Sequence, residues 1–208
     1  MCQQTLKEQL TSILNLTTKG SNENSQLKPF FEANPECLPL FQFQEHHGIV
    51  SQLVFKQYQL NTSEKPDFLW FTKTTQKVTC IICEIKGSNV NIFNQDTSFA
   101  SDFNSAYEQI EARLSLLKGD TKGFLAKFRE DLFPEEIKSP TDINSLDVKG
   151  ILIFGRRFEK GNSKRDQKYA DKSNNGIKIF TYDALADARD FGKKIVDLAS
   201  YSNNRILV

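Results

Sequence analysis

The chain has 208 residues, 38% of them hydrophobic and 11% aromatic, so it can fold around a core of its own without disulfides. Its 27 Lys and Arg nearly balance its 26 Asp and Glu, which excludes a polycation that binds nucleic acid through bulk charge. No apolar run is long enough to span a bilayer, and the polar N-terminus lacks the apolar segment of a signal peptide. We therefore expect a cytoplasmic protein without a membrane partner.

The first predicted elements are two helices. One is expected over residues 3–16, because four leucines and isoleucines recur there at the spacing of a single helical face. These residues are Leu6, Leu10, Ile13 and Leu14. A second helix is expected to begin near Ser25 and to end before Pro35. We expect residues 1–20 to form a helical extension and residues 21–208 to form one α/β domain.

Apolar runs predict the strands that follow, and helical periodicity predicts the remaining helices. The expected strands cover residues 48–60, 66–71, 77–86, 148–154 and 177–182. The expected helices cover residues 99–119, 121–133 and 183–200. A short polar turn joins the second and third of these strands, which predicts a β-hairpin.

Two cysteines, Cys80 and Cys83, have the spacing of a metal-binding pair but lie in a predicted strand. Positions three apart on a strand point to opposite faces, so these thiols cannot hold one zinc ion together. The two histidines, His46 and His47, offer no second ligand pair with the usual spacing. We expect buried, reduced thiols and surface histidines.

The predicted hairpin carries three charged residues, Asp67, Glu84 and Lys86, at one of its ends. The tightest register puts Asp67 opposite Ile82, and a shift by two residues puts it opposite Glu84. Either register leaves the three side chains on one face. Two interpretations remain open: Lys86 forms an ion pair with a carboxylate at a solvated strand end, or the two carboxylates bind Mg²⁺ for hydrolysis while the lysine assists.

The order Asp67, then Glu84-Ile85-Lys86, resembles the D…ExK signature of PD-(D/E)XK nucleases. Over about residues 22–195 the chain also resembles the nuclease domain of the Shedu family, a family of bacterial anti-phage defence proteins. The segments that carry this resemblance are residues 30–35, 65–69, 83–86, 106–110, 153–156 and 181–185. The resemblance implies a restriction-endonuclease-like core, in which helices flank a mixed β-sheet. It also implies Mg²⁺ as cofactor, with Mn²⁺ as a substitute, and assembly into a homo-oligomer.

The resemblance further implies roles for individual residues. Asp67 and Glu84 match the metal-binding acids, and Lys86 matches the catalytic lysine. Gln109 matches a glutamine that approaches the metal site, although it could also be an ordinary residue on the side of its helix.

The chain departs from the family pattern at two positions. Related enzymes often carry a metal-binding Glu on the first core helix, where this chain has Asn24, with Glu23 and Glu32 as alternative ligands. Arg113 stands where the family often has Tyr. These departures put the accessory ligand in doubt, but not the three central residues.

A basic segment follows the strand over residues 148–154. It holds six basic residues against two acidic ones: Arg156, Arg157, Lys160, Lys164, Arg165 and Lys168 against Glu159 and Asp166. Such a run is often a solvated loop, but beside a nuclease-like sheet it favours binding to nucleic-acid phosphates.

The leading hypothesis is a Mg²⁺-dependent endonuclease that hydrolyses phosphodiester bonds in antiviral defence, with DNA as the expected substrate. One alternative is a catalytically inactive module on the same fold that binds nucleic acid or a protein partner. Another is a nuclease of DNA repair or of DNA junctions, since a fold does not determine its function.

Overall fold

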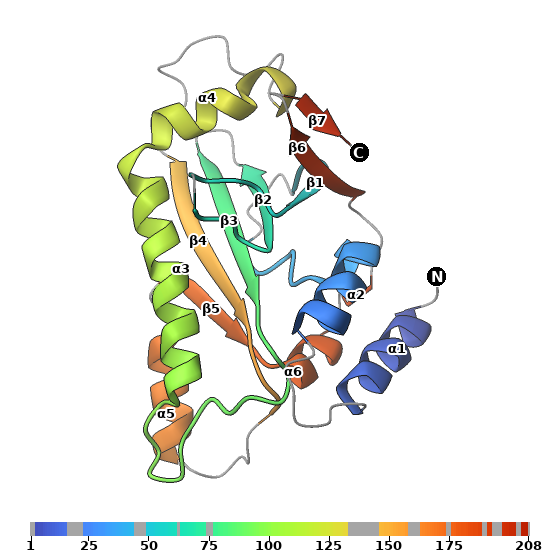
Figure 1. Cartoon of the computed structure of the whole chain (residues 1–208), viewed down its shortest axis with the longest axis vertical. Coiled ribbons are helices and arrows are strands. Elements are labelled where there is room, and N and C mark those ends of the chain that lie inside the picture. Colours follow the sequence, from blue (N-terminus) through green and yellow to red (C-terminus); the bar gives the residue numbers. More distant parts are fainter. Residues whose placement is uncertain are drawn as a thin grey trace.

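The centre of the molecule is a mixed β-sheet, which the computed structural model places between two layers of helices (Figure 1). The structure describes residues 3–15, 23–43, 49–61, 63–73, 77–132, 146–157, 163–173, 176–188, 191–192, 197–202 and 205–207. Seven strands of these described residues run in the order β5-β4-β3-β2-β1-β6-β7. Their bounds are β1 Ile49–Lys56, β2 Phe68–Lys73, β3 Val78–Ile85, β4 Leu146–Ile153, β5 Ile177–Phe180, β6 Asp197–Ser202 and β7 Arg205–Leu207.

The helices divide between the two faces of the sheet (Figure 1). Their bounds are α1 Gln3–Asn15, α2 Lys28–Ala33, α3 Ser101–Gly119, α4 Thr121–Leu132, α5 Ser163–Lys172 and α6 Tyr182–Ala186. Apolar side chains of α3 and α4 pack on one face and form the first core. Those of α1, α2 and α6 pack on the other face and form the second core.

The central strand β3 shows why the sheet needs both layers. All eight of its residues are buried. Cys80 and Ile82 contribute to the first core, whereas Ile81 and Cys83 contribute to the second. A strand covered on both faces is apolar at nearly every position, so a charged residue such as Glu84 requires a partner there.

The β2–β3 hairpin forms as predicted, with a register that the structure now determines. Phe68 pairs with Cys83 and Leu69 with Ile82, which places Asp67 opposite Glu84. This is the register shifted by two residues from the tightest one, and it brings the two acids together.

The basic segment after β4 contains a helix, α5, that the sequence did not lead us to expect. β4 and β5 are parallel neighbours, and parallel strands need a crossover connection, which is usually a helix. None of the α5 residues is buried, so this helix has no apolar stripe that periodicity could detect.

The helix predicted over residues 183–200 is wrong. Helix α6 begins after Thr181, whose hydroxyl accepts a hydrogen bond from the Ala184 amide, and it ends at Ala186. Gly192 has a φ of 74°, which a right-handed helix does not allow. Residues Asp197–Ser202 instead form β6, which pairs in parallel with β1. In the described ranges, no helix has both the length and the hydropathy that crossing a membrane requires.

Candidate active site

Asp67 and Glu84 lie side by side at one end of the β2–β3 hairpin. The Asp67 amide donates a hydrogen bond to Glu84 Oε1 at 3.3 Å, and the Ile85 amide donates to Asp67 Oδ2 at 2.8 Å. Asp67 is 7% exposed and Glu84 2% exposed. The two acids are therefore held by the backbone of adjacent strands in a buried position.

Lys86 is two residues after Glu84 and is the first residue after the end of β3, and its backbone is fixed on two sides. Its amide donates to the Ile153 carbonyl at 2.9 Å, and its own carbonyl accepts a hydrogen bond from the Tyr182 hydroxyl. Its side chain returns to the site, where Nζ donates to Gln109 Oε1 at 3.0 Å and lies 3.8 Å from Glu84 Oε2. The structure thus brings together the four residues expected at the catalytic centre, with Gln109 contributed by α3.

Arg113 also belongs to this site, although the sequence marked it only as a departure from the family pattern. It lies one helical turn after Gln109, so both side chains leave the same face of α3. Its Nη1 donates to Glu84 Oε1, and its Nε donates to Glu64 Oε2 at 2.8 Å. At 5% exposure, Arg113 is a buried cation shared by two acids.

Lys28, on α2, is the second site residue that the sequence analysis missed. Its Nζ lies 2.8 Å from Asp67 Oδ1, and 18% of its side chain is exposed. No local pattern pointed to Lys28, because it reaches the site from a helix on the opposite face of the sheet. The expected accessory acid Glu32 instead pairs with Lys56 at 3.2 Å, and the side chains of Glu23 and Asn24 lie outside the described residues.

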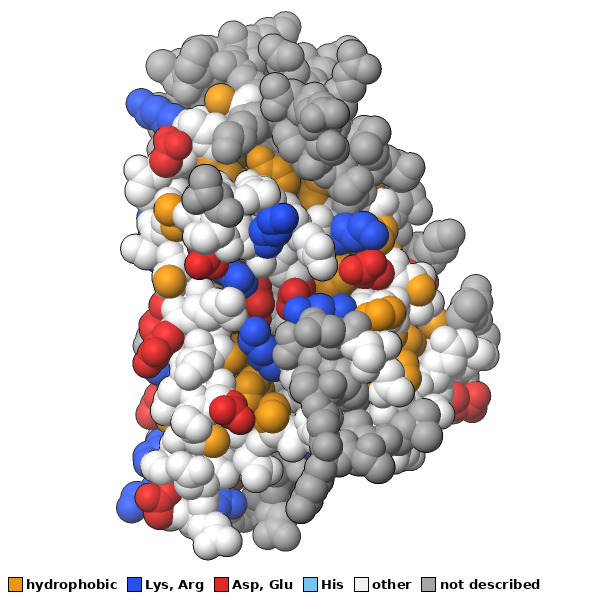
Figure 2. Space-filling view, viewed as in Figure 1, with side chains coloured by type: hydrophobic (Ala, Val, Ile, Leu, Met, Phe, Trp, Pro, Cys, Tyr) orange, Lys and Arg blue, Asp and Glu red, His pale blue; other side chains and the backbone are white. Residues whose placement is uncertain are grey.

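Among the described residues, the six charged groups in contact at this site balance. Three acids, Glu64, Asp67 and Glu84, contact three cations, which are Lys28, Lys86 and Arg113. Figure 2 shows acidic and basic side chains of the described residues intermingled near the centre of one face.

The pKa of Asp67 reflects this environment. Burial raises the pKa of Asp67 above its ordinary value of 3.8, and Lys28, the Ile85 amide and Lys86 offset the effect only in part. The fold therefore holds this carboxylate at an electrostatic cost, which a bound cation would reduce.

The oxygen donors of Asp67 and Glu84 fit a Mg²⁺ ion. In the part of the chain that the structure describes, His, Cys, Asp and Glu do not gather in groups of three or more that could share a metal. Two carboxylates suffice for Mg²⁺, which usually keeps several waters and binds a substrate phosphate.

The cysteines do not supply ligands of this kind. Cys80 and Cys83 point into different cores, as the strand geometry predicted. Burial raises the pKa of both thiols well above 9.0 and that of Cys37 to about 12, so all three thiols stay protonated.

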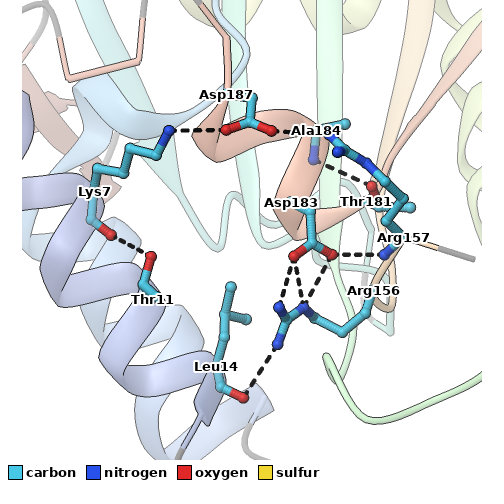
Figure 3. Close-up of polar contacts among 9 residues, drawn as sticks. All are labelled: Lys7, Thr11, Leu14, Arg156, Arg157, Thr181, Asp183, Ala184 and Asp187. Carbon is cyan, nitrogen blue, oxygen red and sulfur yellow. Dashed lines mark hydrogen bonds and ion pairs between the residues drawn. The ribbon is translucent and has the colours of Figure 1, made fainter.

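The first two arginines of the basic segment are engaged in a network that joins α1 to α6 (Figure 3). Nε and Nη2 of Arg156 donate to Asp183 at 2.9 and 2.7 Å. Arg157 Nη2 donates to Asp187 at 2.9 Å, and the other oxygen of Asp187 accepts from Lys7 on α1 at 2.8 Å. Both guanidinium groups are therefore paired with carboxylates of the chain, on side chains that are 42% and 46% exposed.

The rest of the basic segment lies mainly on α5. Arg165 donates to the Asn94 carbonyl at 3.0 Å, and Lys164 is exposed. Lys160 lies outside the described residues. Arg156, Arg157 and Arg165 line a hollow of about 340 Å³ together with residues 88–95, the loop that follows Lys86.

Comparison with known proteins places this site in a family. Residues 20–186 match the model of the family described as Shedu protein SduA, C-terminal. A search of curated proteins found no match. The matched stretch contains strands β1 to β5 and all six charged residues of the candidate site. Since the match covers most of the 208 residues, the chain belongs to the Shedu family.

Proposed function

We propose that this protein is a Mg²⁺-dependent endonuclease that cleaves DNA in defence against phages, with Mn²⁺ as a substitute metal. Membership in the Shedu family supports the defence role. The observation that carries the nuclease role is the juxtaposition of Asp67, Glu84 and Lys86, with the lysine amine held by Gln109 at 3.0 Å. On this proposal, the mixed sheet and its helices are a PD-(D/E)XK core.

Each residue of the site has a separate role in phosphodiester hydrolysis. Asp67 and Glu84 would hold the Mg²⁺ ion, which when bound lowers the pKa of a coordinated water and neutralises phosphate charge. Lys86 is positioned to donate a hydrogen bond to the attacking water or to the phosphate oxygens on which negative charge develops. Gln109 fixes the direction of the Lys86 amine, and Arg113 holds Glu84 in place.

The arginine-lined hollow supports nucleic acid as the substrate. Three of the basic residues named from the sequence, Arg156, Arg157 and Arg165, line it, and the loop that lines it begins two residues after Lys86. Arginine side chains bind phosphate groups and so position a nucleic-acid backbone. We extend the proposal to DNA as partner, to a homo-oligomeric state as in the family resemblance, and to the cytoplasm as location.

Cleavage assays with matched variants test the nuclease function. Supercoiled and linear DNA should be cut in Mg²⁺ and left intact in EDTA. Asp67→Ala and Lys86→Ala should each lower the rate at least about 100-fold, the usual effect of losing a general acid, base or metal ligand. Lys77→Ala is the control, because Lys77 pairs with Asp147 at 2.9 Å at the opposite end of β3. Cleavage that persists in the first two variants would refute the assignment.

A second candidate function is a nucleic-acid-binding module without catalysis. One observation favours it: Lys28 and Arg113 already contact the carboxylates that would bind the metal. Such a module would bind DNA more weakly as salt increases, lose affinity in Arg157→Ala, and show no turnover at any metal concentration.

A further inference from the structure

We infer that the Lys28 amine occupies the candidate metal site and must leave Asp67 before this carboxylate can bind a metal. The inference rests on the proposed function and concerns its regulation. Lys28 Nζ lies 2.8 Å from Asp67 Oδ1, and the side chain comes from α2, whereas both acids belong to the β2–β3 hairpin.

The contacts of the four carboxylate oxygens show why this position matters. Asp67 Oδ2 accepts the Ile85 amide, and Glu84 Oε1 accepts both Arg113 and the Asp67 amide. These two oxygens therefore hold the backbone and α3 in place. Asp67 Oδ1 and Glu84 Oε2 are the oxygens better placed to bind a metal, and Lys28 lies on the first of them.

Lys28 is the cation that a metal on Asp67 Oδ1 would displace, because its amine lies on this oxygen. Arg113 is shared between two acids, and Lys86 is held by Gln109. The side chains of Lys28 and Lys86 are 18% and 22% exposed, compared with 6% for Arg113. A lysine amine is a compact charge on a flexible four-carbon stem, so it can exchange a carboxylate for solvent more readily than a buried arginine.

Charge balance gives the exchange its direction. The six charged groups of the cluster sum to zero, and a divalent ion added to them leaves an excess of two positive charges. When Lys28 leaves, the buried site loses one of these positive charges, and the negative charge of a substrate phosphate compensates the other. Lys28 therefore lowers the affinity for metal in the absence of substrate.

Metal binding by the full chain tests this role without measuring catalysis. Calorimetric titration with Mn²⁺ at one fixed pH should show Lys28→Met binding about tenfold more tightly than the natural protein, a coupling within the usual range. Lys28→Arg keeps the charge and should not gain affinity. Lys77→Met is the matched control, because it removes an ion pair of similar length, 2.9 Å, at the other end of β3.

A second measurement uses the natural sequence and so avoids any folding defect of the variants. In protein labelled with ¹³C at lysine Cε, the Lys28 signal is assigned by its loss in Lys28→Arg. Its relaxation should show greater side-chain mobility when Mg²⁺ binds, while the Lys77 signal stays unchanged. An unchanged Lys28 signal at saturating Mg²⁺ would overturn the inference.

The outcomes separate this inference from the proposed function. DNA cleavage with Mg²⁺, combined with equal Mn²⁺ affinity in Lys28→Met and the natural protein, would overturn only the role of Lys28. Failure of every variant to bind metal, with and without DNA, would overturn the proposed function and this inference with it.

Discussion

Arg113 lies between Glu84 and Glu64 on the buried side of α3, and its contacts make the stability of the site testable at a single residue. Arg113→Met removes the cation nearest to Glu84, and Glu84 is only 2% exposed. Breaking a buried ion pair in this way costs about 3–5 kcal/mol. We expect a loss of this size in the free energy of unfolding, measured by urea denaturation in EDTA.

The double variant Arg113→Met with Glu84→Gln distinguishes pairing from packing. It removes the uncompensated charge, so it should regain part of the lost stability. Equal losses in the single and double variants would show that Arg113 contributes through packing alone.

At the residue scale, the sequence predicts those site residues whose positions follow from the geometry of the strands. Strand alternation places Glu84 and Lys86 on one face, and the hairpin brings Asp67 to the same end. Lys28 and Arg113 could not be predicted in this way, because their roles depend on how α2 and α3 pack against the sheet. Arg113 falls on the apolar side of its predicted helix, three residues after Ile110, which is a signal that could have been used, whereas Lys28 gives none.

At the scale of elements, the close packing of α3 on β4 determines where Gln109 and Arg113 lie. Gly150 of β4 allows this approach, because a Cβ there would lie 2.6 Å from Ile110 Cγ2 and 3.0 Å from Ile177 Cγ1. Gly150→Ala should therefore lower the free energy of unfolding by about 1–3 kcal/mol, as overpacked cores do. Urea denaturation measures the loss.

Gly119 supplies the control for this prediction. It is the last residue of α3, and a Cβ there would meet nothing within 4 Å. Gly119→Ala should leave stability unchanged or raise it slightly. A Gly150→Ala variant as stable as Gly119→Ala would show that α3 can shift away from β4 without loss.

The elements also show where sequence patterns stop being informative. The hairpin and α3 follow from apolar patterns, which record burial directly. Helix α5 buries no residue, so it leaves no such record. The C-terminal segment has apolar residues at helical spacing, yet β6 forms because β1 offers it a partner strand. Pairing between strands distant in sequence decides such cases.

At the scale of the whole molecule, two aspartates should give the stability opposite dependences on pH. Burial alone would raise the pKa of Asp183, but hydrogen bonds from Arg156 and the Arg157 amide outweigh it and lower the pKa below 3.8. Its contribution to stability is therefore present at neutral pH and is lost as pH falls through the folded-state pKa. Asp67 behaves in the opposite way, because burial raises its pKa above 3.8. Its stabilising contribution is present at low pH and is lost as pH rises through the folded-state pKa.

Comparison with non-titrating variants isolates each aspartate. In EDTA, the unfolding free energy of the natural protein minus that of Asp183→Asn should decrease toward acid pH. The same difference for Asp67→Asn should decrease as pH rises above about 3.8. Urea denaturation across a pH series measures both. If the Asp67 difference instead followed the sign of Asp183, then Lys28 and the Ile85 amide would outweigh burial, and Lys28 would hold Asp67 more firmly than a readily displaced cation should.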